Sequence, residues 1–361
     1  MTTYFITLLL VFVFTFVAQN NIVWQTNESN LQLTAKKTNT TKTFYILASL
    51  VLILVAGLRY DVGTDYLNYL VRYDNSVKNF VESLLTLDEP GYKFICWFSN
   101  LIGGDGLTAL FLASTLTIFL FLKTIYKNTY FLLPAVLLYI FLGCWHGAFN
   151  GIRQYLAAAI IFSGVRFIKE RKFWKYALIV FIAFLFHVSA ILMLFPYFIA
   201  NNKISLPNIL FLIGASIVVL FSFSEILTLA GFILNDNVTN AGVYLTQSVN
   251  ILRILVAIAP ALFFLLIYQR RTITKERQFW INMLIINAVM MIATSNSAYL
   301  ARMGIYTVTF SAVGIPELVD GLGQKDKKFI GYTILFLFFA FWVYSIYSSS
   351  LNHFTFIWQK S

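Results

Sequence analysis

The sequence predicts an all-α protein, a polytopic bundle of transmembrane helices in which residues 1–361 form a single integral membrane domain. Apolar residues make up 59% of the chain and charged residues only 11%, whereas a soluble domain carries about 45–50% apolar and about 25% charged residues. The apolar residues form runs of roughly 15–22 residues, and a helix needs about 20 to cross the hydrocarbon layer. The polar breaks between the runs fit short loops between successive crossings.

The net charge of +11 is concentrated in a few short loops. Such loops stay on the cytoplasmic side of a membrane, so we interpret these charges as topology signals. A strongly basic chain can also bind nucleic acid, but here the bilayer is the expected partner and no nucleic acid is expected. The basic segments are 36–42, 123–127, 166–175, 270–277 and 325–328.

With the basic loops placed inside, the first half of the chain follows one path. Helices over 4–18 and 44–58 flank a polar segment, 19–43, that we predict to be a solvated linker. An outer loop covers about 59–91, and the short apolar run 92–103 is predicted to be an interfacial or re-entrant helix. Three further crossings are predicted over 106–122, 130–146 and 148–168.

Segment 173–200 has two interpretations. One long helix would place the basic loop 269–277 outside, against the positive-inside rule, whereas two short crossings that meet near His187 keep that loop inside. We favour two crossings. A second outer loop is expected at about 223–250, and the total is about 10–12 crossings. The remaining helices are predicted over 206–222, 251–268, 279–295, 300–317 and 329–347.

Arginines outnumber lysines among the cations that this topology places outside or within the membrane. A guanidinium binds phosphate through two parallel hydrogen bonds, whereas a topology signal needs only a positive charge. Arg153 and Arg302 are the clearest cases because each lies near the outer start of an inward-running helix, which itself favours an anion. The alternative is that each arginine pairs with a carboxylate or reaches lipid head groups. The outer arginines are Arg59, Arg72, Arg153, Arg253 and Arg302.

The segment GLRYDVGTDYLNY, residues 57–69, places carboxylates and aromatic rings close to Arg59. Carboxylates accept hydrogen bonds from sugar hydroxyls, and flat rings pack against the C–H face of a sugar. Asp61 and Asp65 share one face if the segment is helical, although Gly63 favours a turn. The alternative is a polar helix cap with an Arg59–Asp61 ion pair.

The segment DEPGY, residues 88–92, is predicted to be a second entry from a loop into a helix. Its acids, Asp88 and Glu89, could serve the same chemistry, and the alternative is a capped turn.

His187 is the histidine best placed to accept a proton, because the predicted topology puts it at an outer turn. The alternative is a hydrogen-bonded core histidine, and His146 is a weaker candidate. The acids and histidines do not have metal-ligand spacing, and no P-loop, GxGxxG, HExxH or GxSxG motif occurs. We therefore expect no metal and no cofactor. Cys96 and Cys144 are expected to be buried free thiols.

Five segments together resemble the EpsG-like branch of the Wzy family, the bacterial polymerases of O-antigen, capsule or exopolysaccharide. The resemblance extends from about residue 44 to residue 317, and neither 201–250 nor the C-terminal tail carries a matching motif. The five segments are LRYDVGTDYLNY, DEPGY, GIRQYLAAAI, FHVSAILMLFP and ARMGIYTV.

The resemblance implies a metal-independent glycosyltransferase at the outer face of the bacterial cytoplasmic membrane. Such an enzyme transfers a growing glycan from undecaprenyl diphosphate onto the terminal sugar of another undecaprenyl-diphosphate-linked repeat unit. The lipid-linked oligosaccharide donor and acceptor are then the substrates, and a chain-length regulator and a flippase are the implied protein partners.

The resemblance also implies roles for particular residues, written here as expectations. The expected diphosphate ligands are Arg59, Arg153, Arg302 and Arg253. The expected catalytic groups are His187, Asp61 or Asp65 as the base, together with Arg153. The expected sugar-binding residues are Tyr66, Tyr69, Glu89, Tyr92, Gln154 and Tyr306.

Two other functions fit the same composition. A flippase for lipid-linked oligosaccharide would share the arginines, but it predicts inverted-repeat halves or helices broken near the midplane, which the sequence does not display. A membrane O-acyltransferase that modifies surface glycans would place its histidines toward a cytoplasmic acyl donor. A ligase that moves finished chains shares the chemistry of a polymerase, and the sequence does not separate the two.

Overall fold

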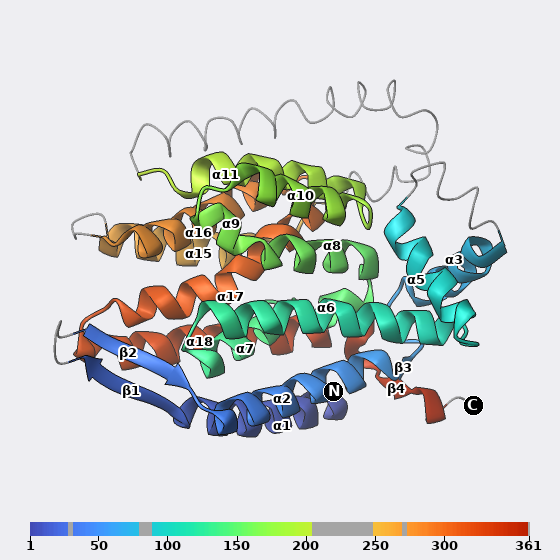
Figure 1. The fold of residues 1–361 in the computed structure, drawn as a ribbon, viewed down its shortest axis with the longest axis horizontal. Coiled ribbons are helices and arrows are strands. Elements are labelled where there is room, and N and C mark those ends of the chain that lie inside the picture. Colours follow the sequence, from blue (N-terminus) through green and yellow to red (C-terminus); the bar gives the residue numbers. More distant parts are fainter. Residues whose placement is uncertain (28–31, 79–88, 204–247, 269–272, 360–361) are drawn as a thin grey trace.

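The computed structural model describes residues 1–27, 32–78, 89–203, 248–268 and 273–359 (Figure 1). Within these residues the predicted fold class is confirmed, because helices predominate and the strands form only two separate two-stranded sheets. Asp88, the predicted helix 206–222 and nearly all of the predicted outer loop 223–250 lie outside the described residues.

In the described part of the chain, five helices are long and apolar enough to cross a membrane. Polar caps set the starts of α2 and α6: the Thr41 N–H donates to Thr38 Oγ1 at 3.1 Å, and the Thr108 N–H donates to Asp105 Oδ1 at 3.0 Å. Apolar side chains on their outer faces, such as Leu9 and Leu266, are exposed, as contact with lipid requires. The helices are α1 (Thr2–Asn20), α2 (Asn39–Gly57), α6 (Gly106–Asn128), α15 (Ile251–Tyr268) and α18 (Gln324–Tyr347).

Further helices pack inside the bundle. α16 (Lys275–Ala293) packs along α17 (Gly304–Asp320), and α17 also packs against α7 (Leu132–Phe141) and α8 (Ile152–Ser163). The helix predicted over 130–146 ends at Phe141, because the chain turns at Gly143, whose φ is +82°. The helix predicted over 148–168 is divided into α8 and α9 (Val165–Lys169).

The segment predicted to be a solvated linker is instead an antiparallel hairpin. β1 (Ile22–Asn27) pairs with β2 (Gln32–Lys37), and Ile22 lies opposite Lys37 in the register. Backbone pairing holds this segment together despite its polar composition. The prediction of a linker at 19–43 was therefore wrong.

Segment 173–200 forms two antiparallel helical pieces, as the interpretation with two crossings requires. α10 (Phe173–Phe184) runs toward a turn that contains His187, and η2 (Val188–Met193) and α11 (Leu194–Ala200) return alongside it. The Tyr176 hydroxyl donates to the Met193 carbonyl oxygen at 2.9 Å, and the Tyr176 and Tyr197 rings stack. His187 consequently lies at the tip of a hairpin and not in the middle of a helix.

The described parts of the basic segments come together at one end of the bundle, near the β1–β2 hairpin (Figure 1). Lys37 Nζ donates to the Thr129 carbonyl oxygen at 2.7 Å, which joins the hairpin to the end of α6. Lys169 Nζ lies 2.8 Å from Glu276 Oε1, which joins α9 to the start of α16. Four basic segments that are far apart in the sequence thus lie at the same end.

The opposite end of the bundle carries the segment after α2 and the strand β4 near the end of the described chain. β3 (Arg59–Tyr60) pairs with β4 (Thr355–Phe356), and the Ile357 N–H donates to the Leu58 carbonyl oxygen at 3.0 Å. The ammonium group of Met1 donates to the Asn352 carbonyl oxygen at 3.0 Å. α3 (Tyr66–Lys78) and α5 (Pro90–Leu101) lie at this same end (Figure 1).

Candidate functional site

The loop between β3 and α3 is fixed to the segment that leads into α8. Asn150 Oδ1 accepts a hydrogen bond from the Thr64 N–H at 2.8 Å. Gly63 has a φ of +107°, and a β-carbon there would overlap Asn150 Oδ1. Glycine is therefore required for the close approach, and the two motifs that contain Arg59 and Arg153 are held side by side.

Asp61 and Asp65 do not share a helix face, because α3 begins only at Tyr66. Asp61 has a φ of +50° and its side chain is exposed, while Asp65 is half-buried. The turn that Gly63 favours is the interpretation that the structure supports. Among the described residues neither carboxylate forms an ion pair, and Asp61 is open to solvent.

Arg59 is buried beneath this loop, with only 2% of its surface exposed. Its guanidinium donates to the carbonyl oxygen of Ala56 and to Ser114 Oγ at 3.0 Å, and it lies 4.8 Å from the centre of the Phe149 ring. The Arg59–Asp61 ion pair considered above does not form. Burial lowers the pKa of Arg59 to about 10, so the group is still charged at neutral pH.

Two tyrosines that the sequence singled out form an aromatic pair. The Tyr69 and Tyr92 rings meet edge to face with their centres 5.5 Å apart, and both side chains are buried. The Arg153 guanidinium lies 6.0 Å from the centre of the Tyr69 ring. Tyr66 is buried against Tyr60 instead, with ring centres 5.9 Å apart.

The centre of the site is an ion pair between Arg153, at the start of α8, and Glu89, which precedes α5. Both side chains are largely buried, with 18% and 13% of their surfaces exposed. Glu89 does not cap its own helix through its side chain, and its φ of +52° lies in the left-handed region. Of the two interpretations of DEPGY, entry into a helix is correct, and the Glu89 carboxylate pairs with Arg153.

His187 lies beside this ion pair, with Nε2 3.9 Å from Glu89 Oε1. Its Nδ1 accepts from the Ser189 N–H at 3.3 Å and lies 2.8 Å from Ser189 Oγ. Burial, followed by the charges of Arg153 and Arg302, lowers the pKa of His187 to about 4. The imidazole is therefore neutral at physiological pH, and both arginines act on the same histidine.

Gln154 and Tyr306 hold the helices of the site together. Gln154 Nε2 donates to the Arg302 carbonyl oxygen at 3.1 Å, and the Tyr306 hydroxyl lies 2.9 Å from Ser189 Oγ. Both side chains are buried, and their hydrogen bonds are made to other parts of the bundle. Their expected contact with sugar stays a prediction.

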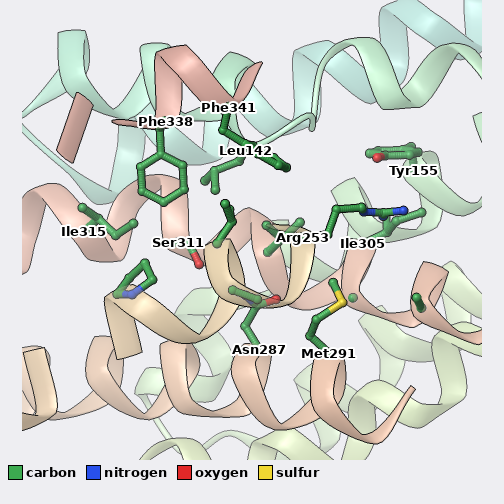
Figure 2. Close-up of a pocket in the computed structure, with 16 residues that line it drawn as sticks. Leu142, Tyr155, Arg253, Asn287, Met291, Ile305, Ser311, Ile315, Phe338 and Phe341 are labelled. Atoms are coloured by element: carbon green, nitrogen blue, oxygen red, sulfur yellow. The ribbon is translucent and has the colours of Figure 1, made fainter. Parts of the chain in front are cut away.

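Arg302 and Arg253 extend the positive charge toward α15. Arg302 is exposed and lies 6.0 Å from the centre of the Tyr299 ring, and the charges of both arginines act on the Tyr155 hydroxyl. Figure 2 shows the Arg253 guanidinium directed toward the side of the pocket that Tyr155 occupies, with Phe338 at the other side. Within the described residues neither Arg253 nor Arg302 forms an ion pair, unlike Arg153.

An apolar groove of about 440 Å³ between α15 and α18 continues from this pocket. Val256, Pro260 and Phe338 line both the pocket and the groove, so the two spaces adjoin. Leu255, Ala259 and other apolar side chains line the rest of the groove. A charged region that opens onto an apolar channel suits a ligand with an anionic head and a long apolar tail.

Sequence reasoning missed three residues that position the site: Asn150, Ser114 and Ser189. Asn150 stands directly before the glycine that starts α8, and Ser189 follows His187 by two residues, a spacing at which a side chain can meet the neighbouring backbone. These local signals could have indicated two of them. Ser114 lies 55 residues from its partner Arg59, and no local pattern connects the two.

In the described part of the chain, no group of three or more His, Cys, Asp or Glu side chains could hold a metal ion. Cys96 and Cys144 are buried free thiols, as expected.

Fold and site together define an integral membrane protein with a cationic site that contains the Glu89 carboxylate and a neutral histidine, at the end opposite its basic loops. The sequence model of the EpsG family matches residues 42–358, and the chain belongs to this family. The match includes the C-terminal tail, beyond the span in which motifs could be recognised. Comparison with curated proteins and with solved structures gives no significant match.

Proposed function

We propose that this chain is a polymerase of a bacterial surface polysaccharide. It transfers a growing glycan from undecaprenyl diphosphate onto the terminal sugar of a second lipid-linked repeat unit. The observation that carries the proposal is the convergence of Arg153, Glu89, His187 and Arg302 at the end of the bundle remote from the basic loops. Membership of the EpsG family supports an exopolysaccharide-related role.

The charge distribution supports a site on the non-cytoplasmic side of the bacterial cytoplasmic membrane. Loops rich in Lys and Arg stay in the cytoplasm. Because the hairpin, α9 and the start of α16 carry such segments at one end, the site at the other end faces the periplasm or the cell exterior.

The leaving group in this reaction is a diphosphate, and its negative charge increases as the bond to the sugar breaks. Guanidinium groups fixed beside that charge stabilise it without a metal ion. The charges of Arg153 and Arg302 both act on His187, and Arg253 lines the pocket that adjoins the apolar groove. We place the diphosphate between these arginines and the polyprenyl tail in the groove between α15 and α18.

The new bond forms when a hydroxyl oxygen of the acceptor sugar attacks the anomeric carbon of the donor. The bond between that carbon and the diphosphate oxygen breaks, and undecaprenyl diphosphate leaves with the electron pair. The hydroxyl proton passes to a base of the site. We assign to Asp61, which is exposed, and Asp65, which is half-buried, the role of accepting hydrogen bonds from the acceptor glycan.

A deletion strain complemented with variants tests the proposal. Arg153→Ala and Arg302→Ala should each abolish long polymer while single lipid-linked units accumulate in the outer leaflet. Complementation with Arg72→Ala, which changes an exposed arginine of α3, is the matched control and should restore the polymer. Accumulation of units in the inner leaflet would instead indicate a flippase, and normal polymer with both site variants would refute the assignment.

A further inference from the structure

Glu89 is positioned by the packing of the start of α5 and by its own left-handed backbone. The Gly91 N–H donates to the Leu185 carbonyl oxygen at 2.8 Å, which fixes the start of α5 to the turn that contains His187. A β-carbon on Gly91 would lie 2.8 Å from the Phe186 ring, so only glycine permits this approach. With its left-handed backbone, Glu89 directs its carboxylate between Arg153 and His187.

His187 is arranged to donate a proton toward Glu89 and not to receive one. A backbone N–H can only donate, so Nδ1, which receives the Ser189 N–H, must be the unprotonated nitrogen of the neutral ring. The proton is therefore on Nε2, the atom 3.9 Å from Glu89 Oε1. The remaining lone pair of the ring is already engaged by Ser189, which leaves Glu89 as the basic group at the centre of the site.

The guanidinium of Arg153 pairs with Glu89 and also lies where an anion would bind. It is the counterion of Glu89, and it lies at the second residue of α8, where the free N–H groups of the helix start favour an anion. Its Nε is buried and has no hydrogen-bond partner among the described residues. A diphosphate that arrives here would engage this free N–H and draw the guanidinium away from Glu89.

We infer that Glu89 is the base of the transfer reaction and that the ion pair with Arg153 keeps it inactive until the donor's diphosphate binds. This inference rests on the proposed polymerase function. When the diphosphate binds Arg153, the carboxylate of Glu89 is released from the ion pair. It accepts the proton of the acceptor hydroxyl while the hydroxyl oxygen bonds to the anomeric carbon of the donor. The electron pair of the broken bond leaves with undecaprenyl diphosphate, and Glu89 afterwards releases its proton to water.

The arrangement couples proton removal to the presence of the leaving group. Without a donor, Glu89 is neutralised by Arg153 and is a poor base, so an acceptor that enters alone is not activated. Asp61 and Asp65 lack such a partner in the described part of the chain, and nothing there would regulate their basicity.

The test uses the full-length protein in lipid nanodiscs and the variants Glu89→Gln, Glu89→Asp and Asp74→Asn. Glutamine keeps the shape of the side chain and removes its charge, whereas aspartate keeps the charge and shortens the side chain. Asp74 is an exposed acid on α3 at the same end and serves as the control. Two quantities are measured: the rate of polymer formation from a lipid-linked repeat unit, and the affinity for undecaprenyl diphosphate.

Glu89→Gln should lower the polymerisation rate by at least about 100-fold, the range expected for loss of a general base. It should also bind undecaprenyl diphosphate about threefold to tenfold more tightly, because the competing carboxylate is neutral. Glu89→Asp should be more active than Glu89→Gln, the reverse of the order that a purely structural role predicts. Asp74→Asn should match the wild-type protein in both measurements.

Two results would overturn the inference while leaving the polymerase intact. One is a Glu89→Gln rate within about threefold of the wild type. The other is weaker binding of undecaprenyl diphosphate by Glu89→Gln. That result would mean that Glu89 helps to bind the ligand and does not compete with it for Arg153. If Glu89→Gln does not fold, Glu89→Asp decides alone, because an inactive Glu89→Asp protein that still binds undecaprenyl diphosphate contradicts the role. A wild-type protein that forms no polymer refutes the proposed function itself, and the inference with it.

Discussion

Substitution of Gly63 by alanine should separate the strain of its backbone from its contact with Asn150. A left-handed backbone costs a residue with a β-carbon about 1–2 kcal/mol. The new β-carbon would also overlap Asn150 Oδ1 and come within 3.0 Å of the Phe149 carbonyl oxygen. Moving Asn150 aside breaks its hydrogen bond with the Thr64 N–H, which is worth about 0.5–1.5 kcal/mol.

Gly103→Ala is the matched control, because Gly103 has a φ of +76° and no atom within 4 Å of the added β-carbon. Equilibrium unfolding in mixed micelles should show that Gly63→Ala loses about 1 kcal/mol more stability than Gly103→Ala. Only Gly63→Ala should also reduce polymer formation, since it separates the loop from α8. When Asn150→Ala is present as well, the two costs should not add. Equal losses for Gly63→Ala and Gly103→Ala would refute the contact.

Three further predictions concern the cations, the histidine and the groove. Arg302→Ala should weaken binding of undecaprenyl diphosphate by about 10–100-fold, as loss of a charged hydrogen bond implies, while Arg72→Ala should leave binding unchanged in the same titration. The pKa of His187 is about 4 in the folded protein, so the unfolded chain binds the additional proton between pH 6.5 and pH 4 and stability falls as the pH falls through this window. His187→Phe should remove on the order of 2 kcal/mol of that dependence, and identical unfolding profiles of the two proteins would contradict the burial of a neutral imidazole. Ala259→Trp should fill the groove between α15 and α18 and reduce retention of a polyprenyl phosphate probe, whereas Leu266→Trp on the exposed side of α15 should not.

The bundle was predictable because the membrane imposes strong constraints on composition. Runs such as 106–122 and 251–268 correspond to α6 and α15, and the turn at His187 follows from keeping one basic loop inside. The hairpin β1–β2 was missed because a strand pair in a polar segment has no apolar period that could reveal it. The pairing of β4 with β3 joins residues almost 300 positions apart, which no local pattern encodes.

The sequence indicated which residues belong to the candidate site better than it indicated how they are arranged. Arg153, Glu89 and His187 stand out because charged or titratable groups next to apolar helices are costly and need a reason. Which of these three side chains contact one another depends on the left-handed backbone of Glu89 and on the hydrogen bond from the Ser189 N–H to His187. Neither can be predicted from residue types. For Arg59 the sequence allowed an ion pair or a ligand site, and the structure instead buries it against Phe149.

The most direct test of the proposed function is reconstitution of the purified protein with the lipid-linked repeat unit alone. The products are separated by glycan length, and free undecaprenyl diphosphate is quantified in the same reaction. The proposal predicts a ladder of polymers and release of undecaprenyl diphosphate in proportion to the bonds formed, both lost in Arg153→Ala. Movement of the intact repeat unit across the membrane without polymer or released diphosphate would contradict it.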